Sequence, residues 1–78
     1  MNLLAAPLGE EIRITAIHAE PKTIKHLAAL GVAVGSHITV FEAQWGASVI
    51  YVKESKLALD HATSKSIEVE VLEGAKHE

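Results

Sequence analysis

The chain contains no cysteine, two prolines and only three aromatic residues among its 78 residues. The lack of cysteine excludes a disulfide framework, a thiolate zinc site and a cysteine-ligated iron–sulfur cluster. Because the aromatics are limited to Phe41, Trp45 and Tyr51, the core must be built from isoleucine, valine, leucine and alanine. A chain of this length buries about 60–65% of its unfolded surface, so we expect one small domain over residues 1–78.

Positive charge and long apolar runs are also scarce. Seven lysines and arginines stand against ten acidic residues, which gives a net charge of −3. The single arginine, Arg13, and the scattered lysines do not form the basic face that duplex nucleic-acid binders usually present. Pro7 and Gly9 interrupt the first apolar stretch, which is too short for a signal segment or a membrane span. We therefore expect a cytoplasmic protein that neither spans a membrane nor binds nucleic acid.

The first third of the chain changes its hydrophobic period. Residues 10–17, EEIRITAI, place Ile12, Ile14 and Ala16 on one face, which predicts a half-buried strand. Pro21 suits the first turn of a helix, where its missing N–H costs nothing. The spacing that follows predicts a helix over residues 21–30 with one apolar face. The residues of that face are Ile24, Leu27, Ala28 and Leu30.

Two glycines four apart follow this helix, in the stretch LAALGVAVGS. Gly31 falls where the helix must end, and a left-handed residue there can turn the chain out, with Val32 folding back onto Leu27. Gly35 precedes a second alternating stretch, SHITVFE, and is expected at a turn position that requires positive φ. The spacing does not match a phosphate-binding loop. We interpret Gly31 and Gly35 as a structural joint between helix and strand.

The remaining two thirds of the chain are typical of short strands. Residues 36–42, 49–52, 56–59 and 66–71 are β-rich or alternate, a turn is centred near Gly46, and residues 60–66 could make one helical turn. About five strands with one early helix predict a mainly β fold, a small antiparallel barrel with the helix inserted after the first strand. We expect the folded core over about residues 8–72 and a polar tail over 73–78. An open edge at residues 67–71 could pair with a copy of itself, giving a homo-oligomer.

The sequence contains no pattern of residues that indicates a catalytic or metal site. Its histidines are not spaced four apart on the expected helix or two apart on a strand, so no ligand set is predicted. They stand at His18, His26, His37, His61 and His77. Asp60 and His61 are adjacent, but neighbours on an extended chain point to opposite sides, which argues against a triad. We expect no enzymatic activity.

Trp45 and the end of the helix are the candidates for binding a partner. Trp45 lies at the expected hairpin tip, where its ring could cover one end of the barrel or anchor a partner protein. Ala28, Ala29 and Val32 add more apolar surface than one small core can use, and surplus apolar surface often marks a docking site.

Residues 27–40, LAALGVAVGSHITV, resemble the signature of the ferrous iron transport protein A (FeoA) family. That signature is a leucine-rich helix, Leu-Gly, two or three residues, a glycine, a small residue and an alternating strand. The stretch from Pro7 to Ile14 resembles the opening turn and first strand of the family, and residues 57–59 and 67–69 resemble its closing strands. Asp60 and His61 differ from the basic residues that are common there.

The resemblance implies an SH3-like barrel and a small cytoplasmic accessory protein of ferrous iron uptake. It also implies a partner, the membrane ferrous-iron transporter FeoB, which bears a GTPase domain. Members of the family are not known as enzymes. Related domains form the C-terminal part of iron-dependent repressors. On this basis we interpret the chain as an adaptor that docks on a FeoB-like transporter. The expected contacts are Lys25, His26, Ala29 and Trp45.

Two other functions are compatible with parts of the sequence. The chain could itself bind a divalent transition metal, Fe²⁺, Zn²⁺ or Mn²⁺, through histidine and glutamate side chains. A shift in the thermal midpoint on adding the metal would distinguish this function from an adaptor. RNA binding through a barrel face is the third function, and the negative net charge disfavours it.

Overall fold

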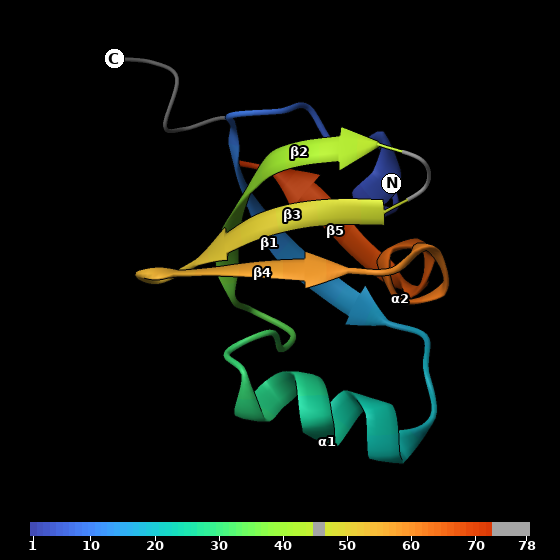
Figure 1. The fold of residues 1–78 in the computed structure, drawn as a ribbon. Coiled ribbons are helices and arrows are strands. Elements are labelled where there is room, and N and C mark those ends of the chain that lie inside the picture. Colours follow the sequence, from blue (N-terminus) through green and yellow to red (C-terminus); the bar gives the residue numbers. More distant parts are fainter. Residues whose placement is uncertain (45–46, 73–78) are drawn as a thin grey trace.

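A computed structural model of the chain describes residues 1–44 and 47–72. The fold is a five-stranded antiparallel sheet in the order β4-β3-β2-β1-β5, with one helix, α1, between the first two strands (Figure 1). The predicted mainly β fold is therefore confirmed. The elements are η1 (Leu3–Ala5), β1 (Glu11–Ile17), α1 (Pro21–Ala29), β2 (His37–Gln44), β3 (Ala47–Val52), β4 (Ser55–Leu59), α2 (His61–Ser66) and β5 (Ile67–Val71).

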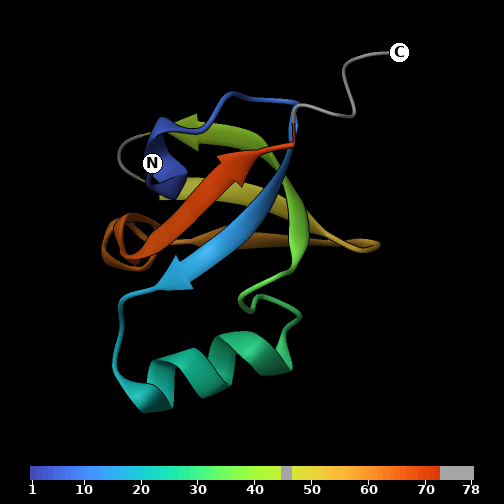
Figure 2. The same ribbon diagram turned by 180° about the vertical axis from the view of Figure 1, so that it is seen from behind.

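The sheet curls around its core. Strands β2, β3 and β4 lie in front in Figure 1, while β1 and β5 lie behind and come to the front in Figure 2. Irregular pairing between Ile14 and Ala16 in β1, and between Val40 and Glu42 in β2, accompanies this curvature. The end strands β4 and β5 are not paired with each other within the described residues, so hydrogen bonds do not close the barrel.

The core formed by residues 1–44 and 47–72 is aliphatic. No aromatic residue among those described belongs to it, because Phe41 and Tyr51 lie on the outside of the sheet. For the described residues, this confirms the core composition expected from the scarcity of aromatics, and Trp45 lies outside them. The buried hydrophobic residues are Leu3, Ala6, Ile12, Ile14, Leu27, Val32, Ile38, Val40, Ile50, Val52, Leu59, Ile67 and Val69.

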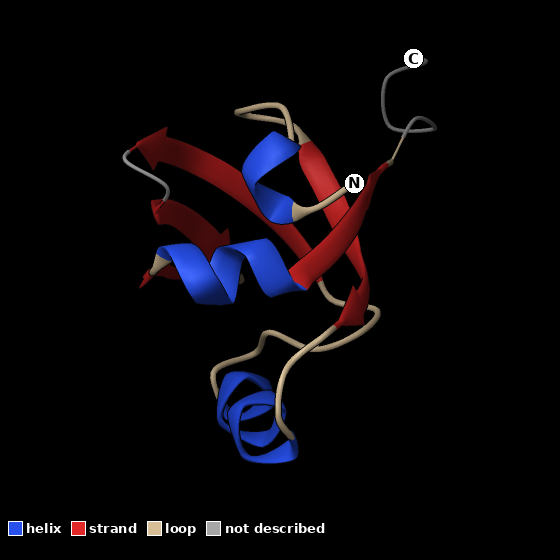
Figure 3. Ribbon diagram, turned by 90° about the vertical axis from the view of Figure 1, so that its right-hand side faces the viewer, coloured by secondary structure: helices blue, strands red, loops and turns tan. Residues whose placement is uncertain are grey.

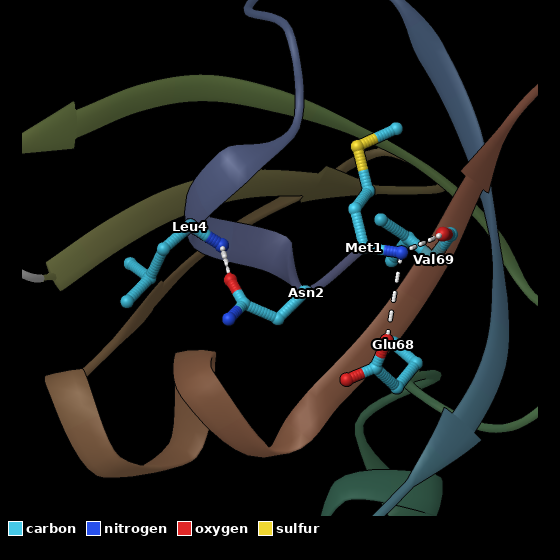
Figure 4. Close-up of polar contacts among 5 residues, drawn as sticks. All are labelled: Met1, Asn2, Leu4, Glu68 and Val69. Carbon is cyan, nitrogen blue, oxygen red and sulfur yellow. Dashed lines mark hydrogen bonds and ion pairs between the residues drawn. The ribbon is translucent and has the colours of Figure 1, made fainter.

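The first residues of the chain contribute to this core, a role that sequence reasoning did not assign to them. Leu3 is fully buried, and Figure 3 shows η1 beside α2 at one end of the sheet, with α1 set apart. The Met1 carbonyl accepts a hydrogen bond from the Val69 N–H at 2.8 Å, and Asn2 bridges to Glu68. Figure 4 shows the Met1 ammonium group between the Val69 carbonyl and the Glu68 carboxylate. The outer edge of β5, predicted to be open, is therefore covered at these two positions by the chain itself.

The joint between α1 and β2 is a sequence of tight backbone turns. Gly31 has φ of +94° and its N–H donates to the Ala28 carbonyl at 3.0 Å, while the Val32 N–H donates to the Leu27 carbonyl at 2.9 Å. This pair of bonds is a Schellman motif, and the buried side chains of Leu27 and Val32 supply its usual apolar residues. Gly35, with φ of +95°, then occupies the third position of a turn.

Candidate partner-binding surface

Helix α1 presents most of its surface to solvent. Its only buried residue is Leu27, and its sequence contains no acidic side chain. Four exposed residues at helical spacing form one stripe on the side away from Leu27. We call this stripe the α1 surface. It consists of Lys22, Lys25, His26 and Ala29.

The α1 surface combines positive charge with apolar area. Lys22 and Lys25 form no ion pair with any of the described residues, although the whole chain carries a net charge of −3. At the end of the helix, Leu30 and Val34 are 43% and 65% exposed. A surface of this kind suits a partner face that is acidic and partly apolar.

Backbone hydrogen bonds anchor the segments that flank α1. Before the helix, the His18 N–H donates to the Ser66 carbonyl at 2.8 Å. After it, the Gly35 N–H donates to the Ile14 carbonyl at 2.8 Å, and the Ile14 N–H donates to the Ser36 carbonyl at 2.9 Å. The Ser36 hydroxyl also donates to the Gly31 carbonyl at 2.9 Å. The segments that lead into and out of α1 are therefore anchored at β1 and at the end of α2.

The predicted contacts are only partly described by the structure. Lys25, His26 and Ala29 lie together on the exposed stripe of α1. Trp45 lies outside the described residues. The expected burial of the apolar helix face is only partly observed, because Leu27 is buried while Ala28 and Leu30 are exposed.

A second exposed cluster was not found from the sequence. The rings of Phe41 and Tyr51 meet edge to face with centroids 5.3 Å apart, and the Lys56 ammonium lies 4.9 Å and 5.7 Å from the two centroids. We call these three residues the aromatic patch. They come from β2, β3 and β4, and the pairing of these strands brings them together, with Lys56 opposite Tyr51. Three β-rich runs alone did not determine this register.

Two pairs of charged or titratable side chains lie on the sheet. Arg13 on β1 forms an ion pair with Glu70 on β5, and His37 Nδ1 lies 3.4 Å from Glu11 Oε2. Within the described part of the chain, no group of three or more histidine, aspartate or glutamate side chains is placed to hold a metal ion.

Asp60 has a local structural role at the start of α2. Its carboxylate accepts a hydrogen bond from the Thr63 N–H at 2.8 Å, which makes Asp60 the N-cap. The backbone N–H of Thr63, followed by its side chain, lowers the pKa of Asp60. His61 beside it is the first residue of the helix.

The helices of the described residues are short. None of those in residues 1–44 and 47–72 has both the length and the apolar character needed to cross a bilayer.

Comparison with protein families decides which family these features belong to. The family model of the FeoA domain, which describes the sequences of that family, matches residues 1–71. The chain belongs to the FeoA family. The residues that carried the predicted resemblance are those of the joint, which ends α1, turns at the two glycines and starts β2. A comparison with curated proteins gives no match.

Solved structures of FeoA proteins and of a repressor share the fold. Iron(II) transport protein A from Clostridium thermocellum matches with a TM-score of 0.81 at 22% identity, over 95% of this chain and 47% of that one. An iron uptake regulatory protein (FeoA) matches at 0.82 and 19%, over 92% and 97%. A manganese-dependent transcriptional repressor matches at 0.81 and 20%, over 92% and 41%. The chain thus spans about half of two of these proteins, and the likeness confirms the predicted SH3-like fold of the family.

Proposed function

We propose that this FeoA-family chain is a small, non-catalytic accessory protein of ferrous iron uptake that acts in the cytoplasm. The family match supports a role in ferrous iron transport, and structures named for iron(II) transport share the fold. In this proposal the partner is a FeoB-like membrane transporter with a GTPase domain, and the chain docks on its cytosolic side.

The observation that carries the docking proposal is the outward presentation of α1. A basic, partly apolar helix with one buried residue contributes little to the core, while hydrogen bonds anchor the segments before and after it to the body of the protein. A helix with an exposed basic and apolar stripe can dock on the face of a partner, which is a recurring mode of recognition. Lys25, His26 and Ala29 are the proposed contacts on this helix, and Trp45 is a further proposed contact.

Docking alters transport only if the chain binds one state of the transporter better than another. A ligand with equal affinity for two states does not shift their equilibrium, however tightly it binds. We therefore propose that the α1 surface contacts a part of the transporter that differs between its states, such as the face of its GTPase domain. The sign of the effect on transport follows from which state is bound.

Ferrous iron uptake by cells that lack the endogenous chain tests this function. The cells are complemented with the wild type, with Lys25→Glu, with Ala29→Glu or with Trp45→Ala. Lys65→Glu serves as a matched control, because Lys65 is an exposed lysine on the other helix. We expect reduced uptake with the three contact variants and wild-type uptake with the control.

Two results would contradict different parts of the proposal. Normal uptake in cells without the chain would contradict the role in iron transport. Normal uptake with folded α1 variants, in cells that require the wild-type chain, would contradict the docking surface alone. Thermal unfolding of each purified variant confirms that a loss of uptake does not reflect a loss of fold.

A further inference from the structure

The aromatic patch carries a positive charge that nothing in the described structure neutralises. Phe41 and Tyr51 are 50% and 39% exposed, and Lys56 lies over both rings. Each of the ion pairs among residues 1–44 and 47–72 involves other groups, so Lys56 has no carboxylate partner there. An apolar platform with an unpaired ammonium group suits a ligand that offers an apolar and an acidic group side by side.

The same lysine stands on an open edge of the sheet. Strand β4 is the last in the order, and β3 is its only neighbour in the described sheet. A two-residue turn, Lys53 and Glu54, joins these strands, and Val52 pairs with Ser55 at its base. The pair that flanks such a turn is hydrogen-bonded, and pairs then alternate along an antiparallel ladder. The backbone N–H and C=O groups of Lys56 and Ala58 therefore point away from β3.

The two edges of the sheet differ in whether the backbone groups of the edge strand already have partners. On β5, the Val69 N–H already donates to the Met1 carbonyl, and Asn2 bridges to Glu68. On β4, the residues with outward-pointing backbone groups are also those with side chains on the patch face, since Lys56 lies opposite Tyr51 and Ala58 opposite Val49. One bound strand could therefore form ladder hydrogen bonds and cover the patch at once.

We propose that the outer edge of β4 binds an extended, acidic segment of a partner protein as an added antiparallel strand. An acidic side chain lies opposite Lys56, and a bulky apolar side chain lies opposite Ala58, where the small exposed alanine leaves room. Because the pairing is antiparallel, the apolar residue precedes the acidic one by two positions. This surface is separate from α1 and does not rest on the proposed function.

Charge disfavours a second copy of this chain as the occupant. Pairing β4 with another β4 would bring two unpaired lysines onto one face of a short ladder, and edge lysines oppose such pairing. Strand β5 has the matching alternation, with Glu68 and Glu70 between apolar residues, but β1 and the first residues of the chain already occupy its two sides.

A fluorescent, capped peptide with Tyr-Val-Glu at its centre, flanked by threonines, is the probe for this site. We expect saturable binding to the wild-type protein in an anisotropy titration, with amide shifts concentrated on β4 and not on α1. Replacing glutamate by lysine in the peptide should weaken binding by about fivefold or more, since an attractive cross-strand pair becomes repulsive. The Lys56→Glu variant should reverse this preference, while Lys65→Glu should keep it.

Peptide backbone methylation tests the strand pairing without altering the protein. Methylation of the glutamate or tyrosine amide removes a ladder hydrogen bond and should abolish saturable binding. Methylation of the central valine amide, which points away from β4, should leave the affinity within about twofold. An absence of saturable binding, equal affinity for both charges, or equal effects of the methylations would each overturn the proposal. Self-association through β4 in sedimentation experiments would assign the edge to a second copy instead.

Discussion

Gly31 is packed closely where α1 ends. A Cβ atom at this position would lie 2.9 Å from Val52 Cγ1, and the residue has φ of +94°. Gly35 has almost the same φ, +95°, but a Cβ atom there would meet nothing within 4 Å. The two glycines share a backbone requirement, and only Gly31 adds a steric one.

This difference predicts unequal costs for the same substitution. Gly35→Ala should lower the free energy of unfolding by about 1–2 kcal/mol through backbone strain alone. Gly31→Ala should lower it by about 2–4 kcal/mol, because overpacking against Val52 adds to that strain. Urea unfolding of both variants measures the two costs. Equal costs would show that the packing against Val52 does not matter.

Asp60 predicts a pH dependence of stability. Its pKa is lower in the folded protein than in the unfolded chain, mainly because the carboxylate accepts the Thr63 N–H. The stabilisation is therefore fully present above the unfolded pKa and is lost as the pH falls through the folded pKa. Between pH 7 and pH 2.5, the urea midpoint of the wild type should fall further than that of Asp60→Asn, which keeps a cap that does not titrate. Equal falls would exclude this contribution of Asp60.

At the scale of elements, α1 should be the least stable regular part of the fold. It buries one residue, whereas the sheet strands hold most of the core. Native-state hydrogen exchange should therefore show α1 amides opening at a lower free energy than amides of β1, β2 and β3. Leu27→Ala should remove most of the remaining protection of α1. Exchange of α1 only through global unfolding would contradict this prediction.

The elements show where sequence reasoning succeeds and where it fails. Alternation predicted β1, β2 and β5 because one face of each packs on the core, and short β-rich runs predicted β3 and β4. Gly31 and Gly35 predicted the turns after α1 because the backbone there needs positive φ. The burial of the helix face was overestimated, because the sheet supplies enough apolar residues to fill the core without Ala28 and Leu30. Leu3 was not assigned to the core, because a short apolar run without periodicity gives no sign of what it packs against.

At the scale of the whole molecule, two exposed surfaces lie on one small aliphatic core. The α1 surface was predicted from local sequence, since its residues follow one another on a helix. The aromatic patch was not, because Phe41, Tyr51 and Lys56 meet only through the pairing of three strands. Long-range register therefore sets the limit of prediction for the site as well as for the fold.

The measurement that tests the central claim most directly is a titration of isotope-labelled protein with the cytosolic part of its own cell's FeoB-like transporter. Backbone amide shifts report which surface is bound. We expect saturable shifts concentrated on residues 22–30, which Lys25→Glu reduces and Lys65→Glu does not. Saturable shifts confined to other elements, or an absence of shifts with the intact transporter in detergent, would contradict docking through α1.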